Sequence, residues 1–106
     1  MTDKGNNESL TIEIGPNRTI IVHGDIDMAG GPALDQAIIA MESDGPIVID
    51  IGDVSFIDSS GLRSLLNASR RAGQRQSTVT LRNVGAEVTR LFEITGTTEQ
   101  FTIEPE

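Results

Sequence analysis

The sequence lacks cysteine, tryptophan and tyrosine among its 106 residues. The absence of cysteine excludes a disulfide, a thiol nucleophile and a cysteine-ligated metal site. His23 is the one histidine, and a single histidine cannot form a zinc site alone. Because three phenylalanines are the only aromatic residues, the hydrophobic core must be built from Ile, Leu, Val and Ala.

Positive charge is also scarce. Eight Lys and Arg residues against 16 Asp and Glu give a net charge of -8. Nucleic acids and anionic membranes attract positively charged surfaces, so we expect no direct binding to either.

The chain also lacks the long apolar runs that mark export or membrane insertion. No segment approaches the roughly 18 apolar residues of a membrane-spanning helix, and residues 1–8 lack the apolar run of a signal peptide. We therefore expect a cytoplasmic protein with a disordered tail at residues 1–8. A chain of this length is typical of one domain, here residues 9–106.

Hydrophobic periodicity predicts strands that alternate with helices. Residues 9–14 alternate between apolar and polar, and residues 19–24 form the predicted hairpin partner across a turn at Pro16 and Asn17. Pro32 suits the first turn of a helix, and an apolar face of that helix is predicted from the spacing of Leu34, Ala37, Ile38 and Met41.

The second half of the chain repeats this alternation. Residues 47–51 predict a strand, and a second helix follows with Gly73 as its natural stop. Its predicted apolar stripe consists of Leu62, Leu65, Leu66 and Ala72. A strand at residues 77–84, a short helix capped by Gly96 and a last strand at residues 100–104 complete the chain.

The order β-β-α-β-α-β-α-β predicts an α/β fold. We expect one mixed, mostly parallel sheet that opens with an antiparallel hairpin, with right-handed crossovers and with helices packed on its faces. Residues Ile47–Ile51 are almost continuously apolar, which is typical of a central strand covered on both faces.

The segment FIDSSGLRSLL, residues 56–66, carries the strongest functional signal. In open α/β sheets, functional groups gather beyond the carboxyl ends of the strands, and Asp58, Ser59 and Ser60 lie at such a point. Any of the three could cap the helix by accepting from free N–H groups of its first turn. Capping explains one such residue but not three in a row before Gly61.

Catalysis is a weaker interpretation of these serines. A nucleophilic serine needs a base and an orienting acid, and nothing in the sequence places His23 beside Ser59. Asp25 and Asp27 could hold a divalent cation, but two ligands in one loop are weak evidence, and a solvated loop is the better interpretation. We predict no metal, no cofactor and no enzymatic activity.

Phosphorylation is the interpretation that makes most use of the local chemistry. A serine at a helix start and a loop tip is accessible to another enzyme, and phosphorylation adds about -1.5 to -2 charges at pH 7. The N–H groups and dipole of the helix tolerate that charge, while a partner docked over the site would lose affinity. These arguments do not choose between Ser59 and Ser60.

The segment VIDIGDVSFIDSSGLRSLL, residues 48–66, resembles the signature of the STAS domain, and specifically of the bacterial anti-sigma factor antagonists. Residues 22–34 resemble the second strand and following loop of that family, and residues 83–96 resemble its third helix. The resemblance covers nearly the whole chain after residue 8.

This resemblance implies a switch. An unmodified antagonist of this family binds an anti-sigma factor, usually a serine kinase, and so frees a sigma factor. The kinase phosphorylates the first serine of the pair, which ends the complex, and a metal-dependent serine phosphatase restores it. Transferred to this sequence, the phosphorylated residue is Ser59, and the resemblance implies a partner-binding surface at Asp25, Asp27, Asp58, Ser60, Gly61 and Leu62.

Two departures from the family concern the end of the chain. The sequence stops at Glu106 without the C-terminal helix usual in the family, and Thr97 stands where a leucine is usual. They affect the expected packing there and not the switch. The alternative function that we retain is a STAS partner subunit of a lipid-transport ABC complex, or a stressosome-type scaffold.

Overall fold

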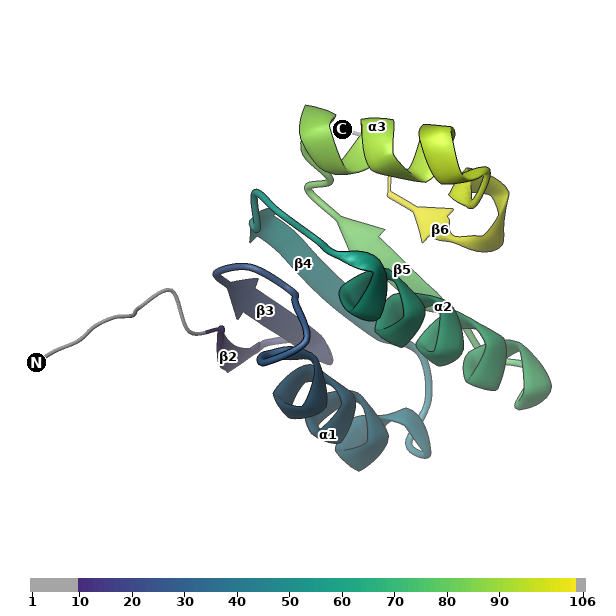
Figure 1. The fold of residues 1–106 in the computed structure, drawn as a ribbon. Coiled ribbons are helices and arrows are strands. Elements are labelled where there is room, and N and C mark those ends of the chain that lie inside the picture. Colours follow the sequence, from purple (N-terminus) through teal and green to yellow (C-terminus); the bar gives the residue numbers. More distant parts are fainter. Residues whose placement is uncertain (1–9, 105–106) are drawn as a thin grey trace, which may run out of the picture.

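The computed structural model describes residues 10–104, so the predicted tail at residues 1–8 lies outside the described residues. One sheet contains five strands in the order β2-β3-β4-β5-β6, and three helices connect its parallel strands (Figure 1). The strands are β2 (Thr11–Gly15), β3 (Thr19–His23), β4 (Ile47–Asp53), β5 (Val79–Arg82) and β6 (Thr102–Ile103). The helices are α1 (Gly31–Glu42), α2 (Ser59–Gln74) and α3 (Ala86–Thr95), with a 3-10 turn η1 (Thr98–Gln100).

The N-terminal hairpin is confirmed. Strands β2 and β3 pair antiparallel, with Thr11 opposite His23 and Gly15 opposite Thr19. The turn between them bends through Asn17 and Arg18, which both have a φ of 58°. Asparagine tolerates this left-handed conformation better than most residues, which agrees with its predicted place in the turn.

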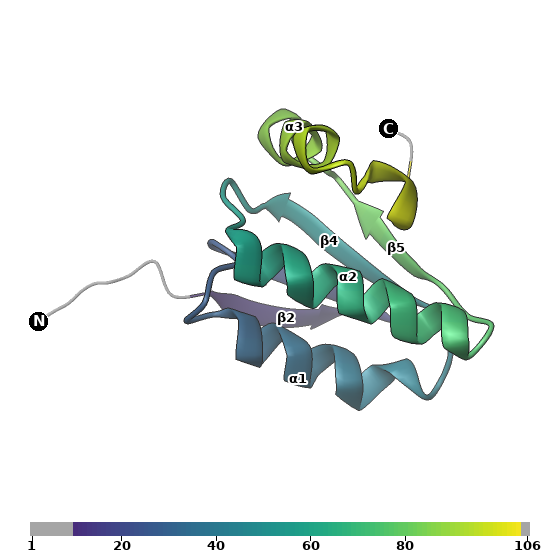
Figure 2. The ribbon, with the colours of Figure 1, turned by 45° about the vertical axis from the view of Figure 1, so that its right-hand side comes forward.

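The predicted parallel sheet is confirmed, and its strand order fixes where the helices lie. Strand β3 pairs in parallel with β4, β4 with β5, and β5 with β6. Right-handed crossovers that all advance in one direction place every connecting helix on the same face of the sheet. Figures 1 and 2 show α1 and α2 side by side over this face, and Val88 and Phe92 of α3 belong to the same buried core.

Strand β4 is central, as predicted, but the expectation that it is covered on both faces is wrong. Ile47, Ile49 and Ile51 are fully buried, whereas Val48 and Asp50 are only half-buried. The apolar run alone could not reveal this, because one-sided coverage follows from the direction of the crossovers. The opposite face of the sheet carries no helix within residues 10–104 (Figure 2).

Helix α2 passes its predicted stop. Gly73 lies inside the helix, which ends at Gln74 with Arg75 as the C-cap residue. A glycine costs a helix only about 1 kcal/mol relative to alanine. Burial of Leu65, Ala68 and Ala72 against the sheet offsets that cost, because tertiary packing dominates helix stability in proteins.

The C-terminal end packs without the leucine that the family places at position 97. Thr97 is buried, and its hydroxyl lies 2.9 Å from the hydroxyl of Thr95. Phe92 of α3 stacks on Phe101 with a distance of 4.6 Å between ring centroids. The predicted cap Gly96 is confirmed, with a left-handed φ of 71°, and the last strand is shorter than predicted.

Candidate functional site

Two loops meet at the carboxyl end of the sheet, where the signature segment lies. Ile26, beyond β3, forms a parallel bridge with Ile57, beyond β4. The backbone N–H of Ile26 donates to the carbonyl oxygen of Phe56 at 3.0 Å, and that of Asp58 donates to the carbonyl oxygen of Ile26 at 3.1 Å. The loop with Asp25 and Asp27 is therefore joined by backbone hydrogen bonds to the segment that starts α2.

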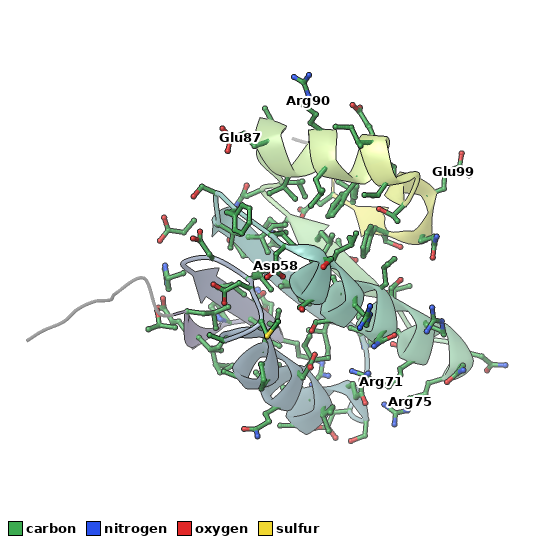
Figure 3. All side chains as sticks on the ribbon, in the orientation of Figure 1. Asp58, Arg71, Arg75, Glu87, Arg90 and Glu99 are labelled. Atoms are coloured by element: carbon green, nitrogen blue, oxygen red, sulfur yellow. The ribbon has the colours of Figure 1, made fainter. Side chains whose placement is uncertain are left out.

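Asp58 is the residue that caps α2. Its Oδ1 accepts from the backbone N–H of Gly61 at 2.9 Å, and its Oδ2 accepts from the backbone N–H of Met28 at 3.2 Å. Figure 3 shows Asp58 at the start of the helix, between the two loops. One carboxylate thus caps the N-terminus of the helix and holds the neighbouring loop, so neither serine is needed for these contacts.

Gly61 makes the close approach of helix and loop geometrically feasible. A Cβ atom at this position would lie 2.1 Å from the carbonyl oxygen of Ile26 and 2.7 Å from its Cγ2. Real atoms do not approach so closely, so any side chain here would push the helix and the loop apart. Gly61 is buried and Leu62 is 9% exposed, and both therefore face the interior more than the surface.

The two serines differ in their exposure. Ser59 is the first residue of α2 and is exposed, while Ser60 is half-buried. Because Asp58 supplies the N-terminal cap, the hydroxyl of Ser59 is not needed to cap the helix. Ser59 is therefore the residue of the pair that an incoming enzyme can reach more easily.

The acidic loop beside the serines is ordered by its own hydrogen bonds. Asp27 Oδ1 accepts from the backbone N–H of Gly30 at 2.9 Å, and Asp25 and Asp27 are both half-buried. Between residues 10 and 104, no group of three or more histidine, cysteine or carboxylate side chains could hold a metal ion. Asp25 and Asp27 place two carboxylates on the loop that is joined to the start of α2.

Exposed apolar side chains accompany this negative charge. Met28 is 74% exposed and Phe56 is 53% exposed, one in each of the two joined loops. A groove of about 250 Å³ lies between residues 55–57 and α3, where Ile94 forms part of the lining. An exposed apolar surface with a polar rim is typical of protein–protein contact.

A second groove follows α2 away from Ser59, and the sequence analysis did not identify it. Its volume is about 410 Å³, and its lining consists of Ser59, Leu62, Arg63, Leu66, Asn67 and Arg70. These positions recur every three or four residues from Ser59, which is the spacing of one helix face. That spacing in the sequence could have revealed the groove.

His23 takes part in a different cluster, on the face of the sheet that carries no helix. Its Nδ1 lies 2.7 Å from Asp53 Oδ2, and its Nε2 lies 3.0 Å from Glu13 Oε1. Hydrogen bonds to Asp53 and then to Glu13 raise the pKa of His23 above its ordinary value. The histidine bridges carboxylates on either side of β3, as a structural residue at the end of its strand.

The described part of the chain, residues 10–104, contains no helix that is both long enough and apolar enough to cross a membrane.

Residues 11–103 match a family model described as Mlab, STAS domain.

Relatives and solved structures agree with this match. An anti-sigma-B factor antagonist of Listeria monocytogenes is 36% identical over 94 residues, which cover 83% of this chain and 82% of that protein. The crystal structure of an anti-sigma factor antagonist from Mycobacterium paratuberculosis superposes with a TM-score of 0.79 at 29% identity, covering 97% of this chain and 92% of the other. The Bacillus cell fate determinant SpoIIAA in its phosphorylated form shares the fold, with a TM-score of 0.65 at 18% identity over 92% of this chain and 93% of its own.

Proposed function

This chain belongs to the anti-sigma factor antagonist family of STAS domains, and we propose that its unphosphorylated form binds an anti-sigma factor and releases a sigma factor. Anti-sigma factor antagonists are regulators and not enzymes, in agreement with the sequence prediction for this chain.

The observation that carries the proposal is the division of roles at the start of α2. Asp58 caps the helix and Gly61 permits the close approach of the loop, while Ser59 is exposed and has no structural task there. A modification of Ser59 can therefore change the surface without changing the fold. Such a position is suited to a switch.

The proposed docking surface surrounds Ser59. Asp25, Asp27 and Asp58 give it negative charge, and the exposed side chains of Met28 and Phe56 give it apolar anchors. Ser60 lies at its edge, while Gly61 and Leu62 shape it from beneath, since both are buried. A partner with basic and apolar groups fits this surface, because opposite charges steer association and apolar burial stabilises the complex.

Phosphorylation of Ser59 would reverse this fit. In the proposed reaction, a serine kinase that is itself the anti-sigma factor transfers the γ-phosphoryl group of ATP to the Ser59 Oγ. The hydroxyl proton leaves and ADP is released. The new dianion then lies beside Asp58 within an already negative surface, and burying it under the partner costs affinity.

We further propose that a metal-dependent serine phosphatase hydrolyses the phosphoester and restores the binding form. Because the fold is shared with SpoIIAA in its phosphorylated form, a phosphate is compatible with this architecture in a relative.

Mass spectrometry after incubation with the kinase and ATP tests the modified residue. We expect one phosphate on Ser59, none on the Ser59→Ala variant, and an unchanged result for Ser60→Ala as the matched control. A phosphate on Ser60 would contradict the assignment.

A second candidate is a STAS partner subunit of a lipid-transport complex, since the matching family model is described as Mlab, STAS domain and not as an antagonist. A pull-down from the native lysate separates the two, because recovery of an ABC-transporter subunit without a kinase-type anti-sigma factor would favour this candidate.

A further inference from the structure

The groove along α2 contains an arginine whose charge is not used within the described fold. Arg63 is exposed, and it forms no ion pair with any residue between 10 and 104. By contrast, Arg71 and Arg75 pair with Glu42, and Arg82 pairs with Glu104. Arg18, Arg70 and Arg90 likewise form no ion pair within residues 10–104, and of these four arginines Arg63 lies nearest to Ser59 along the chain.

Arg63 shares its groove with Ser59, the residue proposed above as the phosphorylation site. Resting on that proposed function, we propose that Arg63 is a positioning residue for the phosphate of Ser59. Its guanidinium holds the phosphate of the modified protein in the groove of α2, through an ion pair within the same chain.

The spacing of the two residues permits this contact. Ser59 and Arg63 are one helical turn apart, at positions i and i+4, where Cβ atoms lie about 5–6 Å from each other. A phosphate extends the serine outward, and the long arginine side chain can meet it with two parallel N–H donors. Guanidinium and phosphate match each other in such bidentate pairs.

The surrounding charges make Arg63 the natural counter-charge. On one side of Ser59 lie Asp58, at the helix cap, and Asp25 and Asp27, in the loop joined to it. Helix α3 adds Glu87 and Arg90 at the neighbouring groove. On the side of Ser59 that faces the α2 groove, Arg63 is the nearest cation along the helix, and Arg70 follows two turns later.

The pairing has a regulatory consequence. A phosphate held by Arg63 lies along α2 and is stabilised in its dianionic form at neutral pH. A phosphatase must then displace the guanidinium before it can hydrolyse the ester, so Arg63 prolongs the non-binding state of the antagonist.

The test uses the full chain with phosphoserine placed at residue 59 during translation, so that no kinase is required. A ³¹P NMR titration measures the second ionisation of the phosphate, which lies near pH 6 in an ordinary phosphoserine. We expect Arg63→Gln to raise the midpoint by roughly 0.3–0.7 pH units, because a charge-assisted pair at i,i+4 is lost. Arg63→Lys should recover part of the shift.

Arg70→Gln is the matched control, since it removes the same charge from the same groove. Arg70 lies 11 positions beyond Ser59, about 16 Å along the helix, which exceeds the Debye length of about 10 Å at 0.1 M salt. The ionisation midpoint of the phosphate in Arg70→Gln should stay within about 0.1 pH unit of that in the parent protein, as expected from screening beyond one Debye length.

Hydrolysis by alkaline phosphatase provides a second readout, and Arg63→Gln should accelerate it about two- to five-fold, the range expected for losing such a pair. An identical midpoint in Arg63→Gln and the parent would overturn the inference, as would equal shifts in Arg63→Gln and Arg70→Gln. If the shift depends on Arg63 but phosphoserine leaves binding of the anti-sigma factor unchanged, the proposed function fails while the inference holds.

Discussion

The two ends of α2 are held in opposite ways. At its C-terminal end, Glu42 of α1 is 8% exposed and accepts from Arg71 Nε at 3.0 Å and from an Arg75 guanidinium N–H at 3.1 Å. At its N-terminal end, the contact with the neighbouring loop consists of backbone hydrogen bonds, of the bond from the Met28 N–H to the Asp58 carboxylate, and of the bare Cα of Gly61 against Ile26. Figure 3 shows Arg71 and Arg75 near the end of α2 away from Asp58.

This difference shows how one helix can serve both stability and recognition. At the C-terminal end, the charges of Arg71 and Arg75 pair with Glu42 and so join α2 to α1, which leaves these charges less available to a partner. At the N-terminal end, backbone atoms, one glycine and the capping carboxylate of Asp58 provide the contact. The side chains of Ser59, Met28, Phe56 and Arg63 are therefore left for binding and for regulation.

The largest effect should come from adding a side chain at the tight contact between Gly61 and Ile26. In Gly61→Ala, a methyl group would lie 2.1 Å from the carbonyl oxygen of Ile26, and backbone cannot move aside as a flexible side chain can. We expect a loss of roughly 3 kcal/mol in the free energy of unfolding, at the upper end of the overpacking range, measured by urea denaturation. Gly73→Ala is the control, because its Cβ would meet nothing within 4 Å, and it should be neutral or stabilising. Equal effects of the two substitutions would refute the tight contact.

The next effect concerns the ion cluster at the C-terminal end. Glu42→Gln removes the charge that faces Arg71 and Arg75, and we expect a loss of about 1–3 kcal/mol in urea denaturation. This value lies below that of a fully buried pair, because the two guanidinium groups are 31% and 46% exposed and water screens them. Arg75→Gln should cost less than Glu42→Gln, since Arg71 still pairs. Binding of the anti-sigma factor should not change in either variant.

Removal of the cap at the N-terminal end should have a smaller effect. Asp58→Ala leaves the N–H groups of Gly61 and Met28 without their acceptor, and we expect a loss of about 1 kcal/mol, within the range measured for N-caps. Asp58→Asn preserves an acceptor oxygen and should cost less. If alanine and asparagine destabilise equally, charge and not capping is the main contribution of Asp58.

The smallest effect should be the pH dependence that His23 introduces at the same end of the sheet. Its pKa is raised in the folded protein, so its stabilising contribution is complete below the unfolded value of about 6.5 and is lost as pH rises through the folded value. As pH rises from about 6 to about 8, across and above the ordinary histidine pKa of about 6.5, the urea midpoint should therefore fall slightly more in the parent than in His23→Gln. Identical pH profiles would show that the bridge to Asp53 and Glu13 does not contribute.

Local patterns in the sequence predicted much of this fold, and their limits have physical causes. Helical periodicity identified the face of α1 that carries Leu34 and Ile38, and the preference for glycine at helix C-termini identified Gly96 as a cap. Both features depend on residues that are neighbours in the sequence. The overrun at Gly73 and the one-sided coverage of β4 depend on tertiary packing and strand order, which local patterns do not contain.

The candidate site divides in the same way. The resemblance to a known family pointed to Ser59, but the sequence alone left the cap open among three residues. Only the contact with Met28 and Gly61 identifies Asp58 as the cap. The role of Gly61 was also hidden, because it depends on Ile26, which lies far away in the sequence.

The central claim is that Ser59 controls partner binding without supporting the fold. It is tested most directly by titrating the anti-sigma factor, recovered by pull-down, with the unmodified protein and with protein that carries phosphoserine at residue 59. The account predicts tight binding by the unmodified form and by Ser59→Ala, at least a tenfold loss of affinity for the phosphorylated form, equivalent to about 1.4 kcal/mol, and nearly equal urea midpoints for all three. Equal affinities of the two forms, or a phosphorylated form that has lost its fold, would contradict it.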